Sequence, residues 1–237
     1  MQQNQPPAFI LVSTTVLILA VVAAVRGAPP RQSKTVTADD ALKDLMDGNA
    51  RFAMGEATSP RRSPADFRAV SEAQIPIAVV VACADSRVSP ELLFDSGVGE
   101  LFVIRVAGNV VDRAGVTVKG SIEYAVAELN VPLIVVLGHT NCGAVKAAVQ
   151  HIDQKDSLPG SINGLVELIK PVVGKVHGQP GEIVENVTRA NVNAGVEKLK
   201  NLQPILAPRV KAESVKVVGG IYNLNTGAVK LLEPTSK

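Results

Sequence analysis

Short runs of apolar residues recur along the chain, each bounded by residues that favour turns. The clearest runs cover 77–83, 101–105 and 131–139, and they are rich in valine, isoleucine and leucine. Continuous apolar runs of this length are typical of strands that are buried on both faces of a parallel sheet. The pattern therefore predicts a central, mostly parallel sheet.

A helical period of apolar positions separates two of these strands. In the segment 118–129, Ile122, Ala125, Val126 and Leu129 fall on one face of a helix. Alternation of strands with helices favours a doubly wound α/β fold in which helices flank the sheet. Near the C-terminus, the runs 215–224 and 228–232 flank Asn225-Thr226-Gly227, which predicts a hairpin that closes one edge of the sheet.

The N-terminal part of the domain is predicted to form a helical arm. The helix would start at Thr37, with Asp40 three residues later as the acid of a capping box. Its apolar side would be formed by Leu42, Leu45, Met46 and Phe52. The segment 59–66, which contains two prolines and two arginines, is predicted to be a surface loop after this helix.

An uncharged stretch precedes this domain. Residues 8–25 carry no charge, which suggests a signal sequence or a membrane anchor over residues 1–28, followed by the domain 29–237. Val22-Ala23-Ala24 would suit cleavage, whereas the basic residues after the stretch favour a cytoplasmic flank by the positive-inside rule. We expect an exported protein, periplasmic or anchored to the membrane through residues 8–25, with its orientation left open.

Composition limits the classes of function. A chain of 237 residues with 46% hydrophobic content is long enough for one domain with a sizeable core. The net charge is only +2 and aromatic residues make up 3%, so nothing in the composition supports nucleic-acid binding.

Two segments carry the candidate chemistry. Cys83 ends the first predicted strand, while His139 and Cys142 follow the third, and the chain has no other cysteine. Ligands bind at the carboxyl ends of strands in open α/β sheets, so adjacent strands would bring these residues together. Two thiolates and one imidazole leave a fourth position free, as in catalytic zinc sites. Buried free cysteines, a disulfide and a metal-free thiol redox protein are the alternative interpretations.

The chain resembles the β-class carbonic anhydrases from about Asp39 to Leu232. The pairing of Cys83-Ala-Asp-Ser-Arg87 with Gly138-His-Thr-Asn-Cys-Gly143 is highly specific to that family. Further matches are Asn49-Ala-Arg-Phe52, the segment 99–105, Ala107-Gly-Asn109 and Ser121-Ile-Glu-Tyr-Ala125.

The resemblance implies one zinc ion per chain, bound by Cys83, His139 and Cys142, and the reversible hydration of CO2 to bicarbonate and a proton. It also implies an Asp85–Arg87 dyad beside the metal, with Asp85 as the fourth ligand only in a closed state. Substrate would be bound by Gln74, Phe102 and Tyr124, partly from a neighbouring subunit, because such enzymes are commonly homodimers or higher homo-oligomers.

One departure from the family pattern concerns regulation. Members with a non-catalytic bicarbonate site carry tryptophan three residues before the first cysteine, where this chain has Val80. We therefore expect the open, water-bound form. Hydrolysis of carbonyl sulfide or carbon disulfide at the same site, and a catalytically dead zinc scaffold, are the alternatives. His151 and His177 are the other histidines that could transfer protons, although surface positions suffice to explain them.

Overall fold

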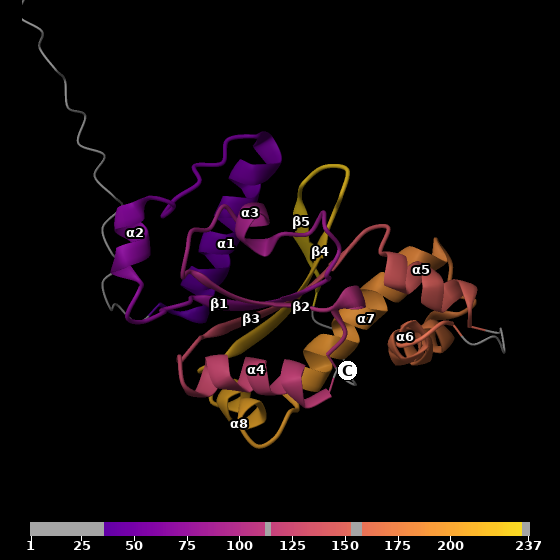
Figure 1. Ribbon diagram of the computed structural model, residues 1–237. Coiled ribbons are helices and arrows are strands. Elements are labelled where there is room, and N and C mark those ends of the chain that lie inside the picture. Colours follow the sequence, from indigo (N-terminus) through magenta and orange to yellow (C-terminus); the bar gives the residue numbers. More distant parts are fainter. Residues whose placement is uncertain (1–35, 112–114, 153–157, 234–237) are drawn as a thin grey trace, which may run out of the picture.

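A five-stranded sheet forms the centre of the computed structural model, which describes residues 36–111, 115–152 and 158–233 (Figure 1). The strands are β1 (Ala78–Ala82), β2 (Leu101–Arg105), β3 (Leu133–His139), β4 (Lys216–Tyr222) and β5 (Val229–Leu231). Their order is β2-β1-β3-β4-β5, and among the described strands only the pair β4–β5 is antiparallel. The predicted α/β fold, with a mostly parallel sheet and a C-terminal edge hairpin, is confirmed.

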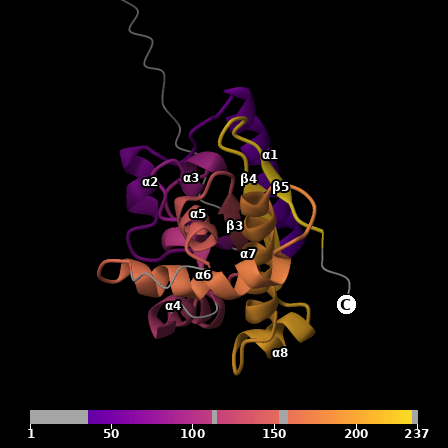
Figure 2. The same ribbon diagram turned by 90° about the vertical axis from the view of Figure 1, so that its right-hand side faces the viewer.

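Helices cover both faces of this sheet. They are α1 (Ala38–Met54), α2 (Pro64–Ala69), α3 (Pro90–Leu93), α4 (Gly115–Ala127), α5 (Gly143–Gln150), α6 (Ile162–Val176), α7 (Ile183–Lys200) and α8 (Leu206–Lys211), with a short 3-10 turn, η1, at Ala107–Asn109. Figure 1 shows α4 and α8 on one side of the sheet and α1 and α3 on the other. Figure 2 shows α5, α6 and α7 beside one another, and α5 and α6 enclose a third apolar cluster.

Burial of the central strand β1 on both faces explains why its sequence is apolar throughout. Val79 and Val81 pack into the cluster under α4, α7 and α8. Ala78, Val80 and Ala82 face the opposite cluster, to which α1 and α3 contribute. Side chains alternate between the faces of a strand, so a strand covered on both sides needs an apolar residue at every position.

The N-terminal helix begins where its cap predicts. Thr37 precedes α1, and its hydroxyl accepts a hydrogen bond from the Asp40 backbone at 3.1 Å. Leu45 is buried, while Leu42, Met46 and Phe52 are partly buried and pack against the same cluster. Sequence reasoning did not predict a role for Asn49, whose buried amide bonds to Leu93, Gly227 and Val229. The side chain thereby ties α1 to α3 and to the C-terminal hairpin.

The prediction of a loop over 59–66 is wrong at its C-terminal end, because α2 begins at Pro64. Ser63 and Asp66 form a reciprocal capping box, and Pro64 occupies the first turn, where its missing N–H costs nothing. The helix predicted over 118–129 is shifted, since α4 covers Gly115–Ala127.

Residues 1–28, for which a signal sequence or anchor is predicted, lie outside the described residues. Among the residues that are described, no helix is both long and apolar enough to cross a membrane.

Candidate metal centre

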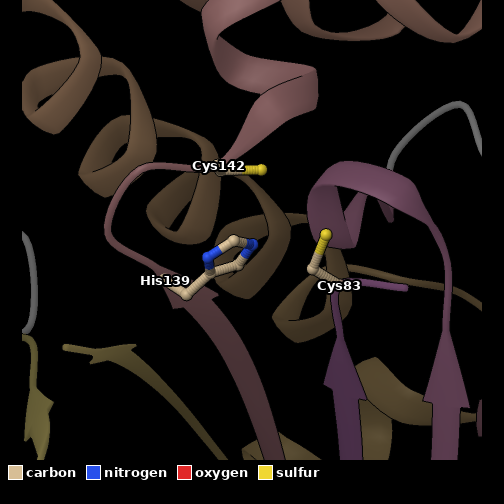
Figure 3. A group of neighbouring side chains, drawn as sticks. All are labelled: Cys83, His139 and Cys142. Atoms are coloured by element: carbon tan, nitrogen blue, oxygen red, sulfur yellow. The ribbon is translucent and has the colours of Figure 1, made fainter. Parts of the chain in front are cut away.

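Three side chains from two adjacent strand ends point into one space (Figure 3). Cys83 follows the last residue of β1, His139 is the last residue of β3, and Cys142 is the N-cap of α5. Since β1 and β3 are neighbouring parallel strands, with Ala82 opposite Leu137, their carboxyl ends lie together. The predicted convergence of the three residues at this edge of the sheet is therefore confirmed.

The candidate ligand atoms form a compact, buried group. The two Sγ atoms and an imidazole nitrogen all lie within 4.8 Å of one another. Cys83 is 4% exposed, His139 0% and Cys142 1%, and neither cysteine is in a disulfide. Two thiols and an imidazole at this spacing could hold a metal ion, and a soft donor set of this kind suits zinc.

The hydrogen bonds of His139 leave one nitrogen available. Nδ1 lies 2.9 Å from the carbonyl oxygen of Thr140, which can only accept, so Nδ1 carries the proton. Nε2 then presents its lone pair, and it is buried with no hydrogen-bond partner among the described residues. A buried, unpaired acceptor is costly unless something binds it. The residues present therefore fit a bound metal ion.

The sulfur of Cys83 accepts a hydrogen bond from the backbone N–H of Gly108 at 3.2 Å. Hydrogen bonding with Cys142 lowers the pKa of the Cys83 thiol, and the Gly108 N–H acts in the same direction against the effect of burial. The same contact raises the pKa of Cys142. At least one sulfur is thus held in the thiolate form that a metal ion requires.

Asp85 and Arg87 form a close ion pair beside the three candidate ligands. Nε and Nη2 of Arg87 donate to the two carboxylate oxygens at 2.9 and 2.7 Å, and the Arg87 backbone N–H donates to Oδ1 at 3.0 Å. This pairing holds the pKa of Asp85 well below its usual range. The carboxylate therefore stays ionised wherever the protein is folded at ordinary pH.

A second arginine, which sequence reasoning missed, holds the loop that carries Cys83 and Asp85. The guanidinium of Arg105, at the end of β2, donates to the carbonyl oxygens of Cys83 at 3.2 Å and Asp85 at 2.7 Å. These contacts lie just beyond the end of the pairing between β1 and β2, after the hydrogen bond that the Ala84 N–H donates to the carbonyl oxygen of Val106. Only the motif match over 99–105 pointed to this residue.

The remaining predicted residues are not part of the Cys-His-Cys group of candidate ligands. Gln74 is exposed in the segment before β1. The rings of Phe102 and Tyr124 lie 6.3 Å apart, and Phe102 packs on the cluster beneath α4, whereas Cys83 and Cys142 belong to the cluster of α5 and α6. His151 lies at the end of α5 opposite Cys142, and His177 follows α6.

A separate cavity of about 290 Å³ lies between α7 and the β4–β5 hairpin. Thr140 and Asn141 line it, but Cys83, Asp85, His139 and Cys142 do not. The cavity is therefore distinct from the candidate metal centre.

Comparisons with known proteins decide the family. The family model described as "Carbonic anhydrase" matches residues 78–229. A carbonic anhydrase of Mycolicibacterium smegmatis is 42% identical over 193 residues, which is 81% of this chain and 91% of the relative. The solved β-carbonic anhydrase CcaA is 28% identical, with a TM-score of 0.64 over 81% of this chain and 95% of the other. The chain belongs to the β-class carbonic anhydrases.

Further relatives agree with this assignment. Carbonic anhydrase 2 of Mycobacterium tuberculosis is 40% identical over 81% of this chain and 91% of its own length. A Coccomyxa β-carbonic anhydrase, solved in complex with acetazolamide, is 31% identical, with a TM-score of 0.64 over 81% and 86% of the two chains. The chain is thus an enzyme of the carbonic anhydrase family with a metal-binding group at the expected strand ends.

Proposed function

We propose that this β-class carbonic anhydrase interconverts CO2 and bicarbonate, with one zinc ion per chain bound by Cys83, His139 and Cys142. The observation that carries the proposal is the geometry of the Cys-His-Cys group beside an ionised carboxylate. The ligand atoms lie within 4.8 Å of one another, and Oδ2 of Asp85 lies 3.9 Å from Nε2 of His139. Zinc, when bound, would activate water for attack on CO2, a reaction for which carbonic anhydrases are the standard example.

Asp85 would orient the reacting water. Its lowered pKa makes it a persistent hydrogen-bond acceptor and a poor store for a proton. The carboxylate would therefore accept a hydrogen bond from the water at Oδ2, while the proton released in the reaction passes on to buffer.

Arg87 would keep this carboxylate in position. Because both oxygens of Asp85 are held by the guanidinium, the carboxylate is restrained from moving onto the metal as a fourth ligand. In this chain the buried Val80 stands where family members with a non-catalytic bicarbonate site have tryptophan. Asp85 is paired with Arg87 in the same chain. This supports the open form as the resting state.

The substrate pocket is proposed to need a second copy of the chain. Phe102 lies on the edge strand β2, which is only partly buried although its first four residues are apolar. Beside it, α4 exposes Tyr124 by 49% and Val116 by 83%. An apolar strand edge with adjoining exposed apolar side chains favours association. Two β-carbonic anhydrases of Sordaria macrospora, described as tetrameric, are among the similar structures (25% identity, TM-score 0.65).

In this arrangement Phe102 and Tyr124 of one copy would line the apolar CO2 pocket of its partner, and the exposed Gln74 would bond to substrate oxygens. Sedimentation equilibrium tests the assembly. The native chain is expected to be a dimer or larger at micromolar concentration, and Val116→Glu is expected to weaken it because a charge would be buried. A monomer with full activity would exclude this assembly.

Stopped-flow CO2 hydration with a pH indicator tests the activity. The protein lacking residues 1–28 is assayed for zinc in the same sample, with Cys142→Ser as the control that loses a ligand. Rapid acidification at about one zinc per chain is expected from the native protein and only the buffer rate from the control.

Full zinc loading without hydration above the buffer rate would contradict the proposal. The same samples would then be assayed for sulfide release from carbonyl sulfide and carbon disulfide. Release would identify a hydrolase of those substrates, and its absence would leave a zinc-stabilised scaffold. A chain that binds no zinc but turns over disulfides would instead be a thiol redox protein.

Residues 1–28 are proposed to direct export, as a cleaved signal or as an anchor through residues 8–25. Cell fractionation and N-terminal sequencing of the mature protein distinguish the two. Recovery in the soluble cytoplasmic fraction with an intact N-terminus would exclude both.

A further inference from the structure

The Cys83 sulfur is connected to the interior of the molecule by two consecutive hydrogen bonds. The backbone N–H of Gly108 donates to Cys83 Sγ at 3.2 Å, and the carbonyl oxygen of Gly108 accepts from Nδ2 of Asn191 at 2.8 Å. Asn191 lies on α7, far from the ligand motifs in sequence, and is only 6% exposed. A buried side chain on a separate helix thus contacts the residue that faces a candidate metal ligand.

Gly108 is closely surrounded by other residues at this connection. Its backbone is left-handed, with φ +73° and ψ 15°, and a Cβ placed there would meet Ile169 Cδ1 at 2.8 Å and Ala144 Cβ at 3.2 Å. The following residue is held as well, because the Asn109 N–H donates to the carbonyl of Val106 at 2.9 Å. Glycine adopts this conformation without steric cost, but it also leaves it readily when its partners are removed.

Asn191 supplies the restraint on the C-terminal side of Gly108. The bond to the carbonyl oxygen holds the peptide that follows Gly108, and this restrains the glycine whose own N–H donates to the sulfur. Donors to a metal-bound thiolate lower the energy of the sulfur electrons and orient the ligand, so such partners tune the metal they do not touch.

We propose that Asn191 is a positioning residue for the metal centre, acting through Gly108 on the Cys83 thiolate. The inference rests on the proposed binding of zinc by Cys83, His139 and Cys142. It concerns how the site is tuned and does not depend on which reaction the enzyme catalyses.

The test uses full-length protein loaded with Co²⁺, because a cobalt thiolate has a charge-transfer band in the near ultraviolet. Asn191→Ala should move this band to longer wavelength, since a sulfur without its N–H donor gives up electrons more easily. Zinc affinity, measured against a chromophoric chelator, should fall by about 10–100-fold, as is typical when a partner of a metal ligand is removed.

Two further variants separate this role from a general effect of helix packing. Asn191→Ser is too short to reach Gly108, yet its hydroxyl can bond within its own helix, as Thr188 does to the carbonyl of Val184 at 2.7 Å. It should therefore fold and show the same band shift. Thr188→Val, one turn earlier and also buried, removes a polar group from the same helix without touching Gly108. Its band should match that of the native protein.

An unchanged cobalt band and unchanged zinc affinity in both Asn191 variants would overturn the proposal. A shift of equal size in Thr188→Val would do so too, because it would show that the helix as a whole, not the bond to Gly108, sets the band. If native protein itself shows no thiolate band with Co²⁺, the proposed metal site fails, and this result is distinct from a failure of Asn191 to tune it.

Discussion

Oδ2 of Asp85 lies 3.9 Å from Nε2 of His139, a buried nitrogen that has no hydrogen-bond partner in the part of the chain that the structure describes. The carboxylate is thus close enough to reach a metal ion held by His139, yet both its oxygens are already bonded to Arg87. We propose that a small movement would change the role of Asp85 from orienting water to occupying the fourth position on the metal. In the proposed mechanism, the strength of its pairing with Arg87 would therefore decide which state the enzyme occupies.

Replacing Arg87 tests this relationship. Arg87→Ala is expected to retain zinc, because it removes no ligand, but to lose most of its CO2 hydration activity, since Asp85 would be free to bind the metal. Stopped-flow hydration and a zinc assay on the same sample measure both. Arg68→Ala, which removes an exposed arginine from α2, should be as active as the native protein. A fully active, zinc-loaded Arg87→Ala would refute the dyad.

Arg105 is expected to matter although it touches neither metal nor carboxylate. Its guanidinium donates to the carbonyls of Cys83 and Asp85, so Arg105→Ala would release the loop that carries both. We expect an activity loss of about 10-fold or more with zinc retained, and a free energy of unfolding lower by about 1–3 kcal/mol. Arg105→Lys keeps a donor group, so its activity and its free energy of unfolding should lie between those of the native protein and of Arg105→Ala. Native kcat in the alanine variant would show that the loop holds its shape without this contact.

Removing the metal should abolish activity reversibly. Dialysis against a strong chelator is expected to reduce CO2 hydration to the buffer rate, because none of the protein groups alone can generate the nucleophile. Added Zn²⁺ should restore it, whereas Mg²⁺ should not, since thiolate and imidazole ligands bind it poorly. Full activity in protein shown to be metal-free would rule out the proposed zinc chemistry.

Ionisation of Asp95 should make the stability of the folded protein depend on pH. Its side chain is fully buried, which alone would raise its pKa, but bonds from Thr58, Arg51 and Ser59 outweigh burial and lower the pKa to about 2. Because the folded pKa lies below the unfolded value of about 3.9, the stabilisation is present above that pH. It is lost as the pH falls towards 2. The stabilisation is about 2–3 kcal/mol at neutral pH.

Urea unfolding of Asp95→Asn measures this contribution. The variant should be less stable than the native protein at pH 7 by about that amount, and the difference should shrink as the pH is lowered through 4 and below. Glu72→Gln, which replaces an exposed carboxylate outside these contacts, is the matched control and is measured in the same way. If the difference in free energy of unfolding between the native protein and Asp95→Asn stayed constant with pH, the charge of Asp95 would contribute nothing to stability.

Much of the fold could be predicted from local patterns. The strands around Val79 and Val135 are apolar throughout because both faces of the sheet are covered, and the cap at Thr37 marks the start of α1. The candidate ligands Cys83, His139 and Cys142 could be grouped because they lie at the ends of such strands, whose carboxyl ends share one edge of the sheet. These signals depend on side-chain chemistry and on neighbours near in the chain, so the sequence alone carries them.

The tertiary structure decided the contacts that hold these groups in place. Nothing near Asn191 or Arg105 in sequence indicates that one reaches Gly108 and the other the carbonyls beside Cys83. Such contacts depend on the register of β2 against β1 and on where α7 crosses the sheet. Register and packing come from the summed burial of many side chains across the whole chain. The sequence by itself thus determined which residues could bind a metal, and only the fold determined which residues position them.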